Sequence, residues 1–245
     1  MGTYLHLFDE EEEQTAHINS AQYREPYFAG VNTTYKAHYN HYNYKKVNFD
    51  TYKPMHYVEN PSNGKGYIKT DYYPNNNTRL IIKAQINIKN SSGAYQFLFE
   101  AHKTYASTMF RLCIPRDTVQ FSYGFGNDKR ISQDNIITNG GIYTIELSQE
   151  GLFLDNEIVF KTPQQNEFTC PNVLLLGCGY ENNSTTAIGS SFMIAHKLYY
   201  CKIYESGVLV RDYVPVKRIS DNKYGVYDQV NNKFIAPTNA NYTGG

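Results

Sequence analysis

From residue 66 onward the sequence is a succession of short segments in which apolar and polar residues alternate. The longest, "TRLIIKAQINIK", begins at Thr78. Successive side chains of a strand point to opposite faces, so its apolar residues share one face. They are Leu80, Ile82, Ala84, Ile86 and Ile88. No segment after residue 66 keeps an apolar period of 3.6 residues, so this part of the chain predicts strands.

Turn residues separate these segments. "YQFLFEAHK", "TMFRLCIP" and "TVQFSYGF" predict single strands, "NVLLLGCGY" predicts a buried strand, and "GGIYTIELSQEGLFLDNEIVF" predicts three strands with turns at "QEG" and "DNE". The 24 tyrosines and the many Asn and Gly residues suit strands and turns respectively. About ten short strands predict an all-β fold, a two-sheet antiparallel jelly-roll sandwich.

The stretch "HKLYYCKIYESGVLVRDYVPVKR", residues 196–218, predicts a hairpin. Gly207 is expected to make the turn, and Pro215 is expected to stop the pairing because proline lacks an N–H group. The predicted core residues of this hairpin are Ile203, Val208, Val210 and Val214. The hairpin is interpreted as scaffold.

The sequence predicts two regions, an extended N-terminal arm over residues 1–58 and the sandwich over residues 59–245. "ENPSNGKG", which begins at Glu59, has the composition of a linker or sharp turn. The arm contains an acidic segment that could form one short helix from Asp9. After it, the apolar residues of the stretch from Tyr23 to Phe49 are nearly all Tyr and Phe, which predicts either disorder or ordering by a partner surface.

Charge and composition exclude several classes of function. The chain has 23 basic and 23 acidic residues and no basic stripe, so no field attracts nucleic acid. No long apolar run predicts a membrane span, and the acidic N-terminus does not resemble a secretory signal. The cysteines have no C-x-x-C spacing and are expected to be reduced, buried apolar residues. They are Cys113, Cys170, Cys178 and Cys201.

Catalytic and metal-binding motifs are not found in the sequence. No G-x-S-x-G elbow is present, and the carboxylates near the hairpin tips are expected to form turns and surface. These are Glu146, Glu150, Asp155 and Glu157. His38 and His41 lack a third ligand nearby, while His102 and His196 are expected to be structural. No cofactor is predicted, except that Asn127, Asp128 and Asp134 are conceivable calcium ligands that suit turns equally well.

The order of these segments resembles the concanavalin A-like jelly roll in its laminin-G-like form, over residues 66–245. The matching segments are "YIKTDYYPNNNTRLIIKAQI", "GGIYTIELSQEGLFLDNEIV", "VLLLGCGY" and the closing run "HKLYYCKIYESGVLVRDYVPVKRISDNKYGVYDQVNNKFI". The closing run is similar to sandwich modules of phage and prophage head or tail proteins. Glucanases share this jelly roll, but their E-x-D-x-x-E pattern is missing here, so no enzyme is predicted.

The arm carries a second resemblance. "YREPYFAGV" and "KAHYNHYNY" are similar to N-terminal segments of virion proteins of phages that infect gut Bacteroidales. The resemblance implies that the arm docks to a capsid or tail neighbour, with self-association into a homo-oligomer. The implied virion-anchor or oligomer contacts are Tyr23, Glu25, Pro26, Tyr27, Tyr39 and Tyr42.

Together these observations predict a noncatalytic structural protein of a phage virion, located in the head or tail, whose lectin-like sandwich contacts a glycan of the bacterial surface. The expected glycan contacts lie in the loops "GFGNDK" and "GYENNS". They are Tyr123, Asn127, Tyr180 and Asn182. The alternative is a free carbohydrate-binding or adhesion module of a bacterium or prophage. A third interpretation, an unrecognised glycosidase, would need a pair of aligned carboxylates in a cleft.

Overall fold

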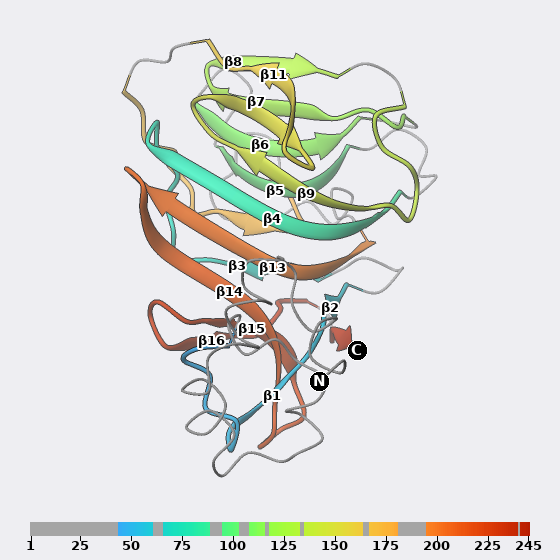
Figure 1. The fold of residues 1–245 in the computed structure, drawn as a ribbon, viewed down its shortest axis with the longest axis vertical. Coiled ribbons are helices and arrows are strands. Elements are labelled where there is room, and N and C mark those ends of the chain that lie inside the picture. The colour runs from blue at the N-terminus through green and yellow to red at the C-terminus, as the bar shows by residue number, and fades with distance from the viewer. Residues whose placement is uncertain are drawn as a thin grey trace, which may run out of the picture.

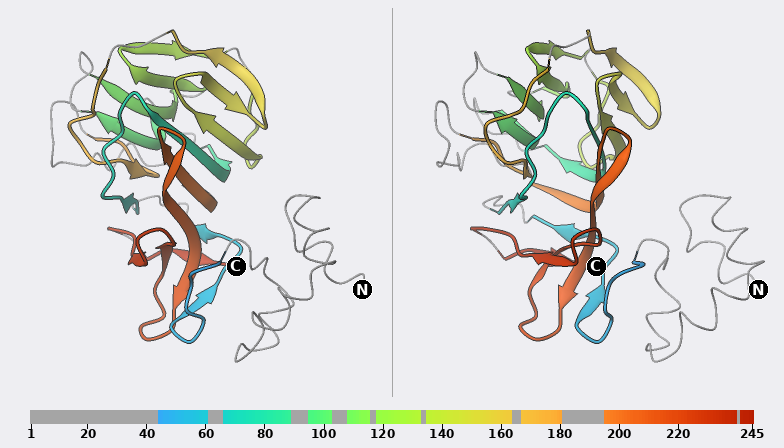
Figure 2. Two further views of the ribbon diagram at one scale, coloured as in Figure 1. Left: turned by 60° about the vertical axis from the view of Figure 1, so that its left-hand side comes forward. Right: turned by 90° about the vertical axis from the view of Figure 1, so that its left-hand side faces the viewer.

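The computed structural model describes residues 44–60, 66–88, 95–102, 108–115, 118–132, 135–163, 167–180, 195–239 and 241–245. Every regular element among them is a β-strand, and the strands form two antiparallel sheets that pack face to face (Figures 1 and 2). The predicted all-β, two-sheet sandwich is confirmed. Within these ranges no helix has the length and apolar character needed to cross a bilayer.

The larger sheet has 11 strands, of which eight follow the order β11-β10-β9-β4-β13-β14-β15-β16. Their bounds are β4 (Thr78–Asn87), β9 (Ile142–Leu147), β10 (Gly151–Leu154), β11 (Glu157–Lys161), β13 (Ala195–Glu205), β14 (Val208–Arg218), β15 (Tyr224–Asp228) and β16 (Lys233–Ile235). Three short strands join the same sheet: β1 (Tyr52–Pro54) pairs with β14, and β2 (Val58–Glu59) pairs with β13 and with β17 (Thr243–Gly244).

The smaller sheet has six strands in the order β3-β12-β5-β6-β7-β8. Their bounds are β3 (Ile68–Lys69), β5 (Gln96–His102), β6 (Met109–Ile114), β7 (Ser122–Gly126), β8 (Asp128–Ile131) and β12 (Leu175–Leu176). The segment "NVLLLGCGY", predicted as a buried strand, thus contributes only two paired residues, in β12, and β3 is equally short.

The main core lies between the two sheets. The apolar face of β4 is fully buried there, as its alternation predicts. This face of β4 packs against Phe99, Phe110 and Phe125 of the smaller sheet. The ring centroid of Phe110 lies 5.7 Å from that of Phe99 and 5.8 Å from that of Phe125. Each such buried side chain contributes about 1.5–3 kcal/mol relative to its exposed state, which makes this core the main source of stability.

The hairpin turns follow from local backbone chemistry. Ser206 and Gly207 join β13 to β14 with φ angles of 50° and 79°, and Asp155 and Asn156 join β10 to β11 with 50° and 69°. Two successive left-handed residues match the right-handed twist of a two-residue hairpin. The turn predicted at Gly207 is confirmed, but Val208 is 65% exposed beside it, so its predicted place in the core is wrong.

Strand β14 changes partner at Pro215. On one edge it pairs with β13 as far as Tyr213 and with β1 from Val216 onward, while its other edge stays paired with β15. The carbonyl of Pro215 still accepts a hydrogen bond from the Met55 amide at 3.1 Å. The prediction that Pro215 stops pairing is therefore wrong for the strand as a whole and holds only for β13.

A second, smaller core lies on the outer face of the larger sheet. Successive residues of β14 point to opposite faces, so Tyr213 enters the main core and Val214 and Val216 face outward. Residues 44–52 cover them, and Tyr52 stacks on Phe234 with ring centroids 5.6 Å apart. The outer face of β14 and β15 is thereby closed to solvent.

This covering segment belongs to the predicted arm. Because β1 and β2 pair within the larger sheet, the predicted boundary between residues 58 and 59 falls inside the sandwich fold. Residues 1–43, with the helix predicted from Asp9, lie outside the described residues.

The four cysteines are free and buried, as predicted. Burial raises the pKa of the Cys113 thiol to about 12, with smaller contributions from its neighbours. Thiols in this state behave as small apolar side chains.

Candidate functional site

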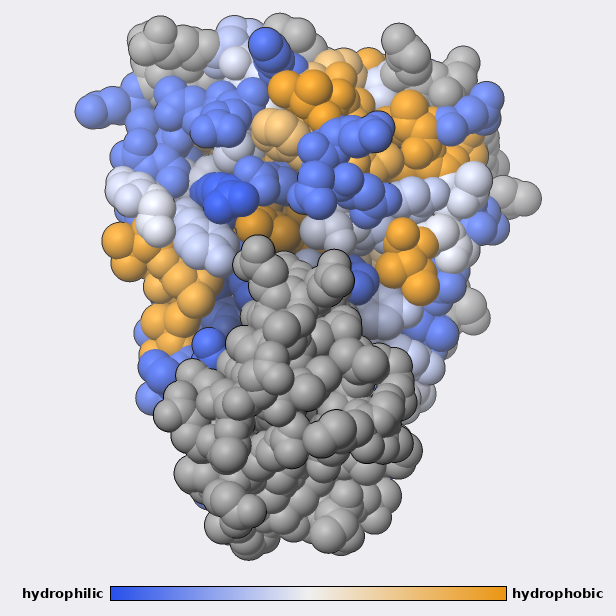
Figure 3. Space-filling view, viewed as in Figure 1, coloured by the Kyte–Doolittle hydropathy of each residue, from blue (hydrophilic) through white to orange (hydrophobic). Residues whose placement is uncertain are grey.

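The outer face of the larger sheet is open where residues 44–52 do not reach it. A groove of about 630 Å³ runs over β4, β9 and β13 at this place. Its lining includes Arg79, Ile81, Lys83, Thr144, Glu146, Glu150, Phe153, Asn156, Tyr200, Lys202 and Tyr204. Figure 3 views this face and shows mostly hydrophilic side chains across the middle of the described part, with apolar groups above and beside them.

Strand register brings these side chains together. Tyr204 lies opposite Arg79 and Tyr200 opposite Lys83, so the polar face of β4 is flanked by two tyrosines of β13. On the other side of β4, Glu146 of β9 lies opposite Ile81. The alternating residues of the same strands fill the main core, which fixes the groove side chains on the outer face.

Arg79 and Glu146 form the polar centre of the groove. Arg79 donates from Nε to Oε1 at 2.7 Å and from Nη2 to Oε2 at 2.8 Å. The hydrogen bonds that Arg79 donates to Glu146 raise the pKa of Arg79, while partial burial opposes that shift. Arg79 is 48% exposed and uses only part of its set of five N–H donors on this pair, so it can donate further hydrogen bonds into the groove.

Positively charged side chains lie close to the aromatic rings of the groove. The Arg79 guanidinium lies 5.4 Å from the ring centroid of Tyr204, and the Lys202 ammonium lies 5.6 Å from that of Tyr200. Such contacts hold a ring and a cation side by side. The groove thus combines flat apolar surface with adjacent hydrogen-bond donors.

The groove continues into a hollow of about 310 Å³ at the ends of the strands, with which it shares Arg79 and Glu150. Polar turn residues line the rest of this hollow. They are Asn76, Asn77, Thr78, Ser148, Gln149 and Ser206. An extended ligand could therefore contact the rings on the sheet and the amides of the turns at the same time.

The covered and open parts of the face meet at Asp212. It pairs in register with Lys202, and the side-chain amide of Gln229 donates to its Oδ2 at 2.9 Å. Burial raises the pKa of Asp212, and Lys202 opposes that shift. This border keeps the larger sheet polar where the second core ends.

The sequence-predicted glycan contacts do not lie in this groove. Tyr123 is fully buried in the main core, stacks on Phe160 with ring centroids 5.2 Å apart, and donates from its hydroxyl to Asp128. Tyr180 is buried as well, and its hydroxyl donates to the Val173 carbonyl at 2.8 Å. Neither ring is placed to contact a sugar at the surface, because each packs in the interior.

The other predicted residues are separate from the groove or outside the structure's description. Asn127 is exposed between β7 and β8. Asn182, Asp134 and all six predicted anchor residues lie outside the described residues. Among the residues that are described, no three or more His, Cys, Asp or Glu side chains gather so as to hold a metal ion, and the calcium candidate Asp128 instead accepts the bond from Tyr123.

A buried charged cluster lies on the smaller sheet. Glu100 and His102 of β5 and Arg111 of β6 are each at most 1% exposed. His102 Nδ1 lies 2.9 Å from Glu100 Oε1, Arg111 Nη1 lies 3.7 Å from the same oxygen, and the Tyr180 amide donates to Glu100 Oε2 at 2.6 Å. His196 is also buried, which agrees with the structural role predicted for both histidines.

The groove was not predicted as a site, although the alternation of the strand that begins at Thr78 puts its polar residues on the face away from the core. Glu146 and Glu150 were expected only to form turns and surface. The signal for the groove was the same alternation in residues 196–205, where Tyr200, Lys202 and Tyr204 recur at every second position. The partner Glu146 could not be found this way, because only the pairing of β4 with β9 brings it to Arg79.

Comparisons with known proteins define the fold. No protein-family model matches the chain, and no curated protein matches its sequence. A candidate carbohydrate-binding protein from Bacteroides ovatus has a similar structure, with a TM-score of 0.52 and 12% identity over 78% of this chain and 60% of that one. The CBM40 of the Ruminococcus gnavus IT-sialidase has a TM-score of 0.40 and 14% identity over 63% of this chain and 89% of its own.

A structure of the same CBM40 with α2,3-sialyllactose bound is 15% identical to this chain and has the same TM-score. At such identities the first likeness shows the fold alone, a two-sheet jelly-roll sandwich.

Proposed function

We propose that this protein is a noncatalytic carbohydrate-binding protein that holds a glycan in the groove over β4, β9 and β13. The observation that carries the proposal is the open sheet face on which Tyr200 and Tyr204 flank the Arg79–Glu146 pair. The structurally similar Bacteroides ovatus protein, which is described as a carbohydrate-binding protein, supports this class of ligand.

The chemistry of the groove suits a sugar. Tyrosine rings offer flat apolar faces to the C–H groups of a pyranose ring, and their hydroxyls add polar contacts. The remaining donors of Arg79 and the turn amides can bond sugar hydroxyls, while Glu146 is already engaged through both oxygens. A site that binds by stacking and hydrogen bonds needs no general acid, which favours recognition over hydrolysis.

We further propose that the protein is part of a phage virion, in the head or tail, where the N-terminal arm docks to other virion proteins and the chain self-associates. This part rests on the resemblance of the closing run at residues 196–235 and of the arm segments that contain Tyr23–Tyr27 and Tyr39–Tyr42. Display in many copies would let a weak glycan contact gain by avidity. The alternative is a free carbohydrate-binding or adhesion module with the same groove.

The groove is tested by binding of the purified protein to an immobilised glycan panel, followed by calorimetry with the best glycan. Tyr200→Ala and Tyr204→Ala are each expected to weaken binding about tenfold, equivalent to roughly 1.4 kcal/mol, because each removes a stacking face. Tyr73→Ala is the matched control, since Tyr73 is 51% exposed and lies outside the groove. A double groove variant that binds every glycan as the unchanged chain does would refute the site.

Location on a virion is tested by quantitative peptide mass spectrometry of purified particles. We expect peptides of the arm and of the sandwich at a fixed ratio to the major capsid protein, because a structural component has a defined copy number. Recovery of the protein only as free material in the lysate would contradict the virion proposal and favour the free module.

A further inference from the structure

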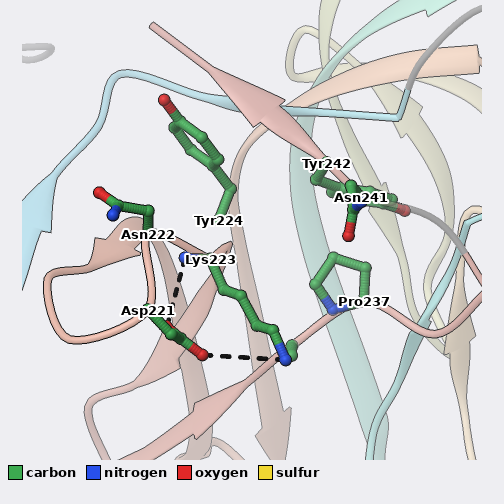
Figure 4. Close-up of a pocket in the computed structure, with 8 residues that line it drawn as sticks. Asp221, Asn222, Lys223, Tyr224, Pro237, Asn241 and Tyr242 are labelled. Carbon is green, nitrogen blue, oxygen red and sulfur yellow. Dashed lines mark hydrogen bonds and ion pairs between the residues drawn. The ribbon is translucent and has the colours of Figure 1, made fainter.

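A second pocket lies at the other end of the larger sheet, between the β14–β15 turn and the C-terminal segment. Its volume is about 440 Å³, within the range of about 300–1,000 Å³ that is usual for small-molecule sites. It is lined by Asp221, Asn222, Lys223, Tyr224, Ala236, Pro237, Asn241 and Tyr242, none of which lines the groove (Figure 4).

One wall of this pocket is a tyrosine ring that its surroundings hold in place. A side chain at Gly244 would come within 2.8 Å of Tyr224 Cδ1, so the C-terminal strand packs directly on the ring. The Lys217 ammonium lies 5.3 Å from the ring centroid. Figure 4 shows Pro237 and Asn241 across the pocket from Tyr224. The pocket therefore lies between the aromatic ring of Tyr224 and the pyrrolidine ring of Pro237, and both rings are apolar.

The carboxylate of the pocket is fixed by an arginine. Arg218 donates from Nε to Asp221 Oδ1 at 2.9 Å and from Nη2 to Oδ2 at 2.6 Å. The guanidinium is itself placed 4.5 Å from the ring centroid of Phe234. The hydrogen bonds from Arg218 lower the pKa of Asp221 to about 2, so the carboxylate is a permanent, oriented acceptor. Lys223 lies nearby, with Nζ 3.8 Å from Oδ2.

The two asparagines of the pocket supply unused polar groups. Asn222 and Asn241 are exposed, and neither side-chain amide has a hydrogen-bond partner among the residues that the structure describes. Asn222 has a φ of 58°, a left-handed conformation that asparagine tolerates and that sets the turn at the pocket edge. Each amide offers two donor hydrogens and one acceptor oxygen.

This set of groups selects the chemistry of a ligand. The charge of Asp221 is balanced by Arg218, and Lys223 adds N–H donors, so the pocket offers mainly hydrogen-bonding groups. A purely apolar molecule would leave the amides without partners as it removed them from water. A polyhydroxylated ring fits this set, because its hydroxyls exchange hydrogen bonds with the two amides and accept from the Lys223 ammonium. Its C–H groups contact the parts of Tyr224 and Pro237 that line the pocket.

We propose that this pocket is a second saccharide-binding site, which takes a single hexose residue and is independent of the groove. This second site goes beyond the function proposed for the groove, because the two sites share no lining residue and either could exist without the other. A chain with both sites would hold two sugar residues of one polymer or of neighbouring glycans, and its apparent affinity would rise by effective concentration.

The test is an NMR titration of the ¹⁵N-labelled full chain with D-glucose, D-galactose and N-acetyl-D-glucosamine, each to about 50 mM, above the roughly millimolar Kd expected for a small site. We expect at least one sugar to shift the side-chain amide signals of Asn222 and Asn241 saturably. In the Asn241→Ala chain the same sugar should bind at least about tenfold more weakly, read from the shift of Asn222. Tyr224→Ala provides a second variant, with its fold checked by the same spectra.

Tyr200→Ala should leave these shifts unchanged, whereas it should weaken binding in the groove. Saturable pocket shifts that persist in Tyr200→Ala support this inference whatever the glycan panel shows, so the two proposals can fail separately. Absence of saturable shifts at both asparagines with all three sugars, or shifts that persist at full strength in Asn241→Ala, would overturn the second site.

Discussion

Replacing Glu100 by alanine is expected to lower the free energy of unfolding by about 3–5 kcal/mol. Glu100 is fully buried on β5 and lies beside His102 and Arg111, which are almost equally buried. Its removal leaves the Arg111 charge in the interior without its carboxylate, and it takes the acceptor from the Tyr180 amide. An uncompensated buried charge is costly because protein surrounds it instead of water.

The chain contains its own control for this experiment. Glu146 also pairs with an arginine on a neighbouring strand, but Arg79 is 48% exposed, so Glu146→Ala should cost only about 0–1 kcal/mol. Glu100→Gln keeps the shape and an acceptor oxygen while removing the charge, and it is expected to fall between the two alanine variants. Urea denaturation measures all three, and equal losses for Glu100→Ala and Glu146→Ala would show that burial does not govern these pairs.

Starting the chain at residue 59 instead of residue 44 is expected to cost about 5 kcal/mol of stability. The shorter chain loses β1 and the segment that covers Val214, Val216 and Tyr227, which are at most 7% exposed in the intact fold. Full burial of such side chains is worth about 1.5–3 kcal/mol each, so exposure of the three together sets the size of the loss.

The comparison is made between the two truncated chains by thermal and urea denaturation, so both lack residues 1–43. Exposed apolar surface should also make the shorter chain bind a hydrophobic dye more strongly. If both chains unfold at the same denaturant concentration, residues 44–58 do not contribute to the stability of the sandwich. The domain boundary predicted at residue 58 would then be right.

The sequence predicted strands and turns well where burial is one-sided. In residues 78–88 alternation alone separates the core face from the outer face, and the left-handed preferences of Gly207 and Asn156 place the hairpin turns. It failed for "NVLLLGCGY", because burial of a run of leucines does not require strand pairing. Gly177 has a φ of 82°, and only Leu175 and Leu176 form a strand there.

The candidate site was harder to predict, because its members are distant in sequence. Arg79 and Glu146 meet only through the pairing of β4 with β9, and no local pattern encodes that register. The error at Tyr123 has a different cause. The residue was predicted to contact a glycan from a loop, although the predicted strand "TVQFSYGF" already contains it. It lies in β7 at an even spacing from Phe125, and this alternation places both rings in the core.

The second core was missed because three of its four covering side chains are aromatic, and such residues look equally suited to an arm; they are Tyr44, Phe49 and Tyr52. The uninterrupted apolar run from Tyr213 to Val216 was the available sign, since a strand that is apolar at successive positions is buried on both faces.

Strand β14 contributes side chains to both cores, so the number of its residues near Pro215 is fixed. Tyr213 belongs to the inner core and Val216 to the outer one, and the change of partner at Pro215 lies between them. A one-residue insertion or deletion at this point would turn every later side chain of the strand to the opposite face. Variation in loop length can be absorbed at the hairpin turns, but the spacing from Tyr213 to Val216 admits substitutions only.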